Sequence, residues 1–198
     1  GFPLILTARS IDHLSKVKEE CLKAGSPKVE LIEVDFLADN PLRELAQLQT
    51  KPSILINNAG DFLFKDLQDS TDQDYLHQFY INALGTIRVT DHLLPVLCKQ
   101  KQALIVNICS KASVVGYADA SAYSVSKHAL YGYGKALRAH LLQFAPHVAC
   151  TNILLGQTFS SSWDGLDVNH ELLIDPFDVA DVIIGLTSLG TRTVVEEI

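Results

Sequence analysis

The chain has 198 residues, enough for one globular domain with a substantial core and few for two domains of typical size. Hydrophobic residues make up 47% and charged residues 20%, which excludes a disordered chain. The formal charge of −7 argues against a nucleic-acid or anionic-membrane partner. No apolar run approaches the ~20 residues that a membrane-spanning helix needs.

Short apolar runs alternate with longer amphipathic stretches along the chain. The apolar runs predict strands over residues 4–8, 29–34, 53–57, 104–109, 148–154 and 193–198. The amphipathic stretches predict helices over residues 11–24, 41–49, 71–97, 122–144 and 176–189. Thr71 with Asp74 is typical of a capping box. Residues 157–175 read as a loop long enough to act as a lid. This alternation predicts an α/β fold with a mostly parallel sheet and helices on both faces. Ligands then bind beyond the carboxyl ends of the strands.

The cysteines and histidines give no sign of a disulfide framework or a metal site. The four cysteines are widely spaced, which is typical of free thiols in a reducing cytosol. The seven histidines form no HxxxH or HExxH pair, and we expect no bound metal.

The first apolar stretch of the sequence is short and has no basic leader, so we expect no signal peptide and a cytoplasmic protein.

Tyr123 and Lys127 stand four residues apart at the start of a predicted helix, so both side chains share one helical face. A free phenol has a pKa of about 10. A nearby ammonium favours the phenolate and lowers that pKa. The pair is therefore a candidate proton donor and acceptor, and the alternative is a surface tyrosine above a solvated lysine.

Other candidate residues follow strands or interrupt a helix. Ser110 follows the strand 104–109, where its hydroxyl can bind a substrate carbonyl or cap a turn; no GxSxG sequence surrounds it to support hydrolase chemistry. A buried strand ends at Asn57-Asn58-Ala59-Gly60. These small and amide residues either let a ligand approach the backbone closely or simply form a turn. Asn82 is a weak helix former and is followed by Gly85, which indicates a local break in the long helix or a polar side chain that acts in the cleft. The alternative is an asparagine that faces solvent.

Together and in this order, these residues resemble the short-chain dehydrogenase/reductase family. The residues that carry the resemblance are Asn57-Asn58-Ala59-Gly60, Asn82, Ser110, Tyr123-Ser124-Val125-Ser126-Lys127 and Gly156-Gln157-Thr158. The resemblance extends from Leu4 to Ile198 and implies a Rossmann-like, doubly wound parallel sheet in a single NAD(P)-binding domain. The stretch from Thr158 to Trp163 and the chain's ending look like a bacterial subgroup that includes sepiapterin-reductase-like and 3-oxoacyl-reductase-like enzymes.

The resemblance implies a role for each catalytic candidate. Tyr123 looks like the general acid that protonates a carbonyl oxygen, and Lys127 like the residue that lowers the pKa of Tyr123 and holds the nicotinamide ribose. Ser110 looks like the residue that binds the substrate carbonyl. Asn82 looks like the residue that positions a water in a proton relay behind Lys127.

The resemblance also implies how the cofactor is held. Asp35 matches the position that hydrogen-bonds the adenine. The wall along the adenine ribose is matched by Asn57, Ala59 and Gly60. The turn that holds the nicotinamide end is matched by Gly156 and Thr158. No acidic residue follows the first strand; Arg9 stands there instead and can pair with a 2′-phosphate, with Ser10 as a second donor. We therefore expect NADP(H) as the preferred cofactor and NAD(H) as the alternative.

Three departures from the family pattern stand out. The glycine-rich phosphate loop and first strand of the family would lie before Gly1, so we expect about 25 to 30 further residues there, the size of a βα unit. Leu155 stands where the family usually has proline. The ending Thr193–Ile198 lacks the glycine-rich terminus of many members.

The leading interpretation is an NADP(H)-dependent oxidoreductase that moves a hydride between nicotinamide and a carbonyl or alcohol substrate. One alternative narrows the substrate to a pteridine side-chain ketone, as in sepiapterin reduction. Another is a non-catalytic dinucleotide-binding scaffold, against which the intact set of Asn82, Ser110, Tyr123 and Lys127 argues.

The two long predicted helices, 71–97 and 122–144, carry apolar residues at helical spacing, and part of each stripe must face the sheet. Tyr131, Tyr133, His140 and Phe144 spread around the second helix. An aromatic-bearing surface of this kind often marks an interface, and the family resemblance implies pairing through these helices. We expect at least a homodimer, with a homotetramer as the alternative.

Overall fold

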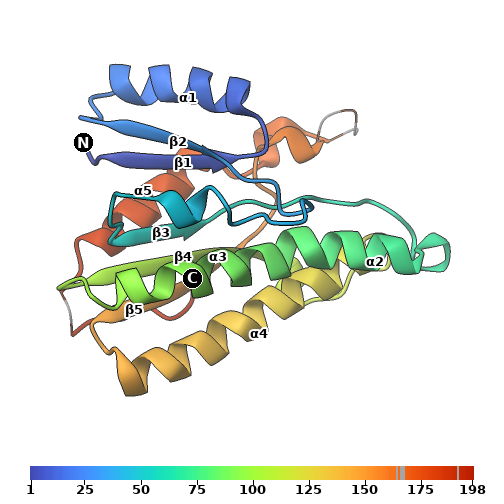
Figure 1. Ribbon diagram of the computed structural model, residues 1–198. Coiled ribbons are helices and arrows are strands. Elements are labelled where there is room, and N and C mark those ends of the chain that lie inside the picture. The colour runs from blue at the N-terminus through green and yellow to red at the C-terminus, as the bar shows by residue number, and fades with distance from the viewer. Residues whose placement is uncertain (164, 166–167, 191) are drawn as a thin grey trace. The chain divides into compact units, whose positions relative to one another are not determined.

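The computed structural model describes residues 1–163, 165, 168–190 and 192–198, and the part of the predicted 157–175 loop at 164 and 166–167 lies outside them. The chain forms two compact units, Gly1–Thr50 and Lys51–Ile198. Within each unit, parallel strands alternate with helices, which confirms the α/β class (Figure 1). The assignment of both units to one dinucleotide-binding domain remains a prediction.

The first unit is a strand–helix–strand motif. Strand β1 (Leu4–Ala8) pairs in parallel with β2 (Val29–Glu33), and α1 (Ile11–Lys23) connects them and covers one face of the pair (Figure 1). The hydroxyl of Ser10 accepts from the amide of His13 and caps the start of α1. Gly25, with a φ of +94°, follows the end of the helix, where a left-handed residue favours glycine.

The second unit is built on a three-stranded parallel sheet in the order β3 (Ile54–Asn57), β4 (Ala103–Ser110), β5 (Val148–Leu155). Strand β4 lies between its two neighbours, and all its residues except Ser110 are buried. Central strands covered on both faces carry continuous apolar runs, which explains the sequence of β4.

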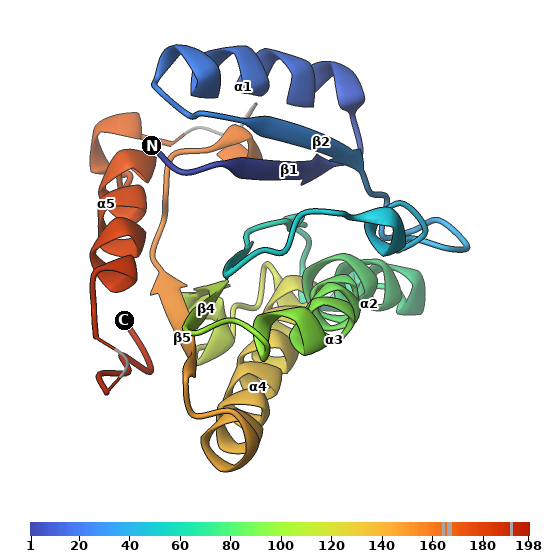
Figure 2. The ribbon, with the colours of Figure 1, turned by 60° about the vertical axis from the view of Figure 1, so that its left-hand side comes forward.

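Helices cover both faces of this sheet (Figure 2). Helix α5 (Pro176–Thr187) packs Leu186 against apolar residues of β4 and β5 on one face. On the other face lie α2 (Asp72–Phe79), α3 (Gly85–Leu97) and α4 (Ser121–Phe144). Leu130 of α4 packs there with Ala83 and Cys109. The second unit therefore has three layers, helix–sheet–helix.

The long helix predicted over residues 71–97 is interrupted at the predicted place. Its start is a capping box in which Thr71 and Asp74 bond each other's backbone amides, as expected. Between α2 and α3, residues Tyr80–Leu84 form a π-helical turn that contains Asn82. Such turns insert an extra residue in a helix and often occur at functional sites.

Two predicted elements are wrong. In place of a helix over 41–49 there is only a 3-10 turn, Leu45–Gln47, in which Leu45 is the buried residue. One buried residue does not repay the entropy of nucleating a helix. In place of a strand over 193–198 there is an isolated bridge, Asn152 to Glu197, and backbone hydrogen bonds join only residues 196–198 to β5. The amide of Thr193 donates to the carbonyl of Gly190 in a local turn instead of pairing with β5.

The predicted loop after β5 is closed at its base. The amide of Phe159 donates to the carbonyl of Ile174, and the amide of Ile174 donates to the carbonyl of Gln157. Between these contacts the structure describes two 3-10 turns, Ser161–Trp163 and His170–Leu172. Among the described residues, no helix is both long and apolar enough to cross a membrane.

Candidate active site

Tyr123 and Lys127 lie one turn apart near the start of α4, as the spacing predicts. The Lys127 side chain is only 6% exposed, and its ammonium donates to the carbonyl of Ile108 on β4 at 3.1 Å. The Lys127 Nζ atom lies 5.7 Å from the centroid of the Tyr123 ring. The pair is therefore not a surface tyrosine above a solvated lysine.

Ser110 is the last residue of β4 and joins this group. Its hydroxyl accepts from the amide of Ala112 at 3.1 Å, so the turn-capping interpretation is correct. The same side chain also lies close enough to the Tyr123 phenol to lower the pKa of that phenol. Ser110 thus caps its turn and still reaches the candidate proton donor.

Asn82 is fully buried and held on all sides. Its Oδ1 accepts from the backbone amide of Asp61 at 2.8 Å. Its Nδ2 lies within donor distance of the Asp61 carbonyl, the Gln78 Oε1 and the Ser126 Oγ. Ser126 in turn donates to the carbonyl of Tyr123 at 2.7 Å. These partners occupy the side-chain amide of Asn82. If this residue binds a relay water as predicted, its backbone must make the contact.

Gly60 leaves room next to the same group. A Cβ atom at this position would lie 2.9 Å from the Asn82 Oδ1 and 3.6 Å from the Lys127 Nζ. Gly60 and its neighbour Ala59 are exposed, so a ligand can approach their backbone. The side chain of Asn57, by contrast, is buried and donates to Thr90 and Asn107, so any ligand contact there is made by its backbone.

Gly156 and Thr158 form the turn that follows β5. The Thr158 hydroxyl donates to the Gly156 carbonyl at 3.2 Å, and Gly156 is exposed. Thr158 also forms the bridge with Ile174 that closes the loop after β5. The turn persists although Leu155 replaces the usual proline, because the backbone contacts to Ile174 hold it.

Three predicted cofactor residues lie in the first unit. Arg9 directly follows β1 and is exposed, and Ser10 caps α1. Because the Ser10 hydroxyl acts as an acceptor in the cap, its own proton stays available for a ligand. Asp35 is exposed, and its Oδ1 accepts from the amide of Leu37 at 3.0 Å.

The electrostatics of the pair differ from the expectation. Burial raises the pKa of Tyr123, and the Ser110 side chain opposes this only in part. Burial is the largest cause of this shift, and the ammonium donates to the carbonyl of Ile108, so the lowering of the Tyr123 pKa by Lys127 stays a prediction. Burial lowers the pKa of Lys127 to about 8, and the Cys109 thiol opposes this shift.

Sequence reasoning missed several residues of this site. Asp61 holds the Asn82 amide through its backbone, and its carboxylate bonds the His77 ring at 3.1 Å. Phe62 packs against the Tyr123 ring, and Trp163 packs against Phe62. These contacts join segments far apart in the sequence, so no local pattern signals them. The position of Asp61 directly after Gly60 is the one hint the sequence contains.

Lys127 predicts a distinctive dependence of stability on pH. Between its folded pKa of about 8 and its ordinary value of 10.5, the unfolded chain holds one proton more than the folded chain. The free energy of unfolding should therefore rise with pH in this window, and below it the cost of burying the charge is fully present. We expect the free energy of unfolding of wild type, measured by urea unfolding and compared with that of Lys127→Met, to rise by on the order of 2–3 kcal/mol from pH 7.5 to 10.5.

Lys135, on the same helix but exposed, supplies the control. Lys135→Met should give a pH profile parallel to that of wild type, because that ammonium stays in contact with solvent. A Lys127→Met profile that is also parallel to wild type would contradict the buried-ammonium interpretation.

Comparisons with known proteins identify the family of this chain. Residues 1–166 match the family model described as short chain dehydrogenase. The mouse dehydrogenase/reductase SDR family member 7 is 33% identical over 165 residues, which cover 79% of this chain and 48% of the relative. Sepiapterin reductase from Chlorobaculum tepidum is 27% identical over 200 residues, which cover 98% of this chain and 81% of the relative. The chain thus spans about half the length of the mouse relative and most of the bacterial one.

Solved structures show the same fold at low sequence identity. Alcohol dehydrogenase from Thermococcus sibiricus, complexed with 5-hydroxy-NADP, matches with a TM-score of 0.88 at 20% identity, covering 100% of this chain and 85% of that one. Serine dehydrogenase from Escherichia coli matches with a TM-score of 0.84 at 22% identity and the same coverage. The parallel sheet with helices on both faces is therefore Rossmann-like, and the family match over residues 1–166 shows that the chain belongs to the short-chain dehydrogenases.

Proposed function

We propose that this protein is an NADP(H)-dependent carbonyl reductase in which Tyr123 supplies the proton. The observation that carries the proposal is the meeting of Tyr123, Ser110 and Lys127 in the second unit, from α4 and the end of β4. This grouping combines a proton donor, a hydroxyl able to bind a carbonyl oxygen, and a buried cation.

The electrostatics favour reduction at neutral pH. Because burial raises the pKa of Tyr123, the phenol stays protonated and can donate from its Oη to the carbonyl oxygen. Ser110 would donate a hydrogen bond to the same oxygen as negative charge develops on it. Lys127, with a pKa of about 8, remains largely an ammonium at pH 7 and stabilises the phenolate that forms.

A nicotinamide dinucleotide fits the residues that the chain offers. The exposed backbone at Ala59 and Gly60 admits a flat ligand, and a side chain at Gly60 would fill the space beside Lys127. Lys127 would hold the ribose hydroxyls, and the turn at Gly156 and Thr158 would hold the nicotinamide end. When bound, the reduced cofactor supplies the hydride to the carbonyl carbon, and the proton from Tyr123 completes the alcohol.

Arg9 supports NADP(H) over NAD(H). Its exposed guanidinium follows β1 directly, and a guanidinium matches a phosphate with two parallel hydrogen bonds. The structural neighbours from Thermococcus sibiricus and the serine dehydrogenase in its closed form carry 5-hydroxy-NADP and NADP+. Asp35 would bond the adenine in the same proposal.

Reduction of a pteridine side-chain ketone is the second candidate. It is favoured by the similarity to sepiapterin reductase over 98% of this chain. A non-catalytic scaffold is disfavoured, because it has no need of a buried lysine beside a buried tyrosine, and burial of such groups costs stability.

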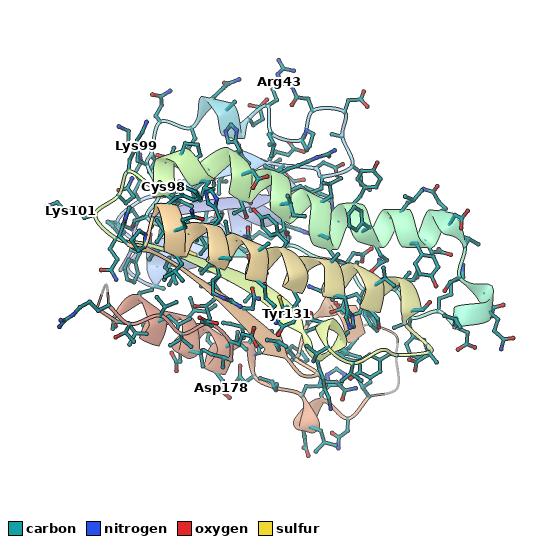
Figure 3. The ribbon with its side chains drawn as sticks, turned by 90° about the horizontal axis from the view of Figure 1, so that it is seen from below. Arg43, Cys98, Lys99, Lys101, Tyr131 and Asp178 are labelled. Carbon is teal, nitrogen blue, oxygen red and sulfur yellow. The ribbon has the colours of Figure 1, made fainter. Side chains whose placement is uncertain are left out.

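A homodimer is part of the proposal. Figure 3 looks onto α3 and α4, which run side by side on one face of the second unit. Leu142 and Phe144 near the end of α4 are 78% and 66% exposed. Large apolar side chains exposed together on one helix are typical of an interface.

Tyr123→Phe should leave cofactor binding nearly unchanged and reduce turnover. The ring and its packing on Phe62 remain, but the transferable proton is gone, so kcat should fall about 10²- to 10⁴-fold. NADPH fluorescence measures binding, and NADPH oxidation with a panel of ketones measures turnover. Tyr131→Phe, on the same helix, is the matched control and should stay within about two-fold. Activity of Tyr123→Phe close to wild type would refute the assignment.

Arg9→Ala should weaken NADPH binding and leave NADH binding almost unchanged. Loss of a charge-assisted contact to the 2′-phosphate should cost about 1.5–3 kcal/mol. Calorimetric titration with both cofactors measures the difference, and Arg43→Ala, another exposed arginine of the first unit, is the control. Equal losses for the two cofactors would mean that Arg9 does not discriminate between them.

Light scattering tests the dimer. At micromolar concentration the mass should be at least twice that of one chain, because burying the exposed side chains of α4 stabilises the pair. Phe144→Glu should shift the mass toward the monomer. A monomeric wild-type protein would overturn the dimer and leave the catalytic proposal intact.

A further inference from the structure

Aromatic rings from three segments meet beside the Tyr123 phenol. The ring of Phe62 lies 4.9 Å from the ring of Tyr123, at an interplanar angle of 83°. Phe62 also contacts Trp163 at 5.9 Å and Phe64 at 6.5 Å between ring centroids. The segments are the stretch after Gly60, the start of α4, and the 3-10 turn in the loop after β5. We call Phe62, Phe64 and Trp163 the aromatic wall.

The aromatic wall presents carbon atoms rather than polar groups. The single donor of Trp163, its Nε1, is used by the carbonyl of Thr158 at 2.8 Å. The indole therefore has no remaining hydrogen-bonding group to offer a ligand. Phe62 and Phe64 have none in their side chains. Phe64 is 58% exposed, and Phe62 and Trp163 are partly exposed.

The aromatic wall lies where a substrate of the proposed reaction would bind. Exposed aromatic surface is unfavourable in water, and a contiguous patch of it commonly marks a binding site. This patch adjoins the ring of Tyr123, the residue that the proposed function uses as proton donor. The hydrogen bond from Trp163 to Thr158 also ties the wall to the turn assigned to the nicotinamide end.

We infer that the substrate carries an aromatic or similarly planar apolar group next to its reacting carbonyl, and that Phe62 and Trp163 hold this group beside Tyr123. This inference deepens the proposed function and depends on it. Aromatic rings pack favourably on each other in edge-on and offset arrangements, which gives the wall a preference for a planar partner. A small or charged carbonyl compound would leave the wall in contact with water.

Kinetics with two ketones test the inference. Phenyl methyl ketone and 2-butanone share the reacting group and differ in the planar substituent. Trp163→Ala should lower kcat/KM for phenyl methyl ketone at least ten-fold more than that for 2-butanone, because loss of the hydrogen bond to Thr158 affects both ketones alike but only one loses its planar partner. Phe159→Ala is the matched control: this aromatic residue lies in the same segment but packs on His170, so both ketones should keep their rates. Equal losses for the two ketones in Trp163→Ala would overturn the inference and leave the proposed reductase standing.

Binding without turnover separates the two proposals. Trp163 is the only tryptophan in the sequence, so intrinsic indole fluorescence reports on the wall alone. In the Tyr123→Phe variant, phenyl methyl ketone should quench this fluorescence saturably, and adding Phe62→Leu should raise the midpoint at least five-fold. Saturable quenching in the variant, together with a wild-type protein that reduces no ketone, would support the wall and reject the reductase. Absence of saturable quenching would overturn the wall, whatever the activity.

Discussion

A row of three buried asparagine side chains crosses the sheet of the second unit, and the candidate site depends on the register that it fixes. Asn57 donates to Asn107 at 2.9 Å, and Asn107 donates to Asn152 at 3.0 Å, between residues paired directly on neighbouring strands. A buried amide without its partner costs about 1–3 kcal/mol, and a slip of one residue turns every side chain to the other face. The row therefore fixes the register of β4 against its neighbours, and with it the position of Ser110 relative to them.

The polar interior explains where the chain uses glycine around the site. A Cβ at Gly134 on α4 would lie 2.2 Å from the Asn152 Oδ1, so this glycine lets the helix approach the end of the row. Gly60 plays the same part beside Asn82. Asn82 is bonded from several sides and Lys127 is buried and bonded to Ile108, so contacts within the fold hold both side chains. A site preorganised in this way needs no rearrangement when charge develops on a substrate.

What could be predicted from the sequence was local. The capping box at Thr71 and the pairing of Tyr123 with the lysine one turn later depend on spacings of three and four residues, which fix the geometry whatever surrounds them. The predictions failed where distant contacts decide. In the stretch 41–49 Leu45 alone is fully buried, and the backbone of 193–198 bonds β5 only from residue 196 onward. The raised pKa of Tyr123 and its aromatic neighbours likewise follow from burial by segments remote in sequence.

The central claim is that this group of residues directs a hydride to a carbonyl carbon while Tyr123 protonates the oxygen. Transfer of label from NADPH deuterated at C4 of the nicotinamide, on the face whose hydride is transferred, tests it most directly, with the alcohol product analysed by mass spectrometry. The account predicts one deuterium, on the former carbonyl carbon, and almost no labelled alcohol from Tyr123→Phe over the same period. Alcohol formed without deuterium from either C4-labelled face, or labelled alcohol formed as fast without the Tyr123 hydroxyl, would contradict it.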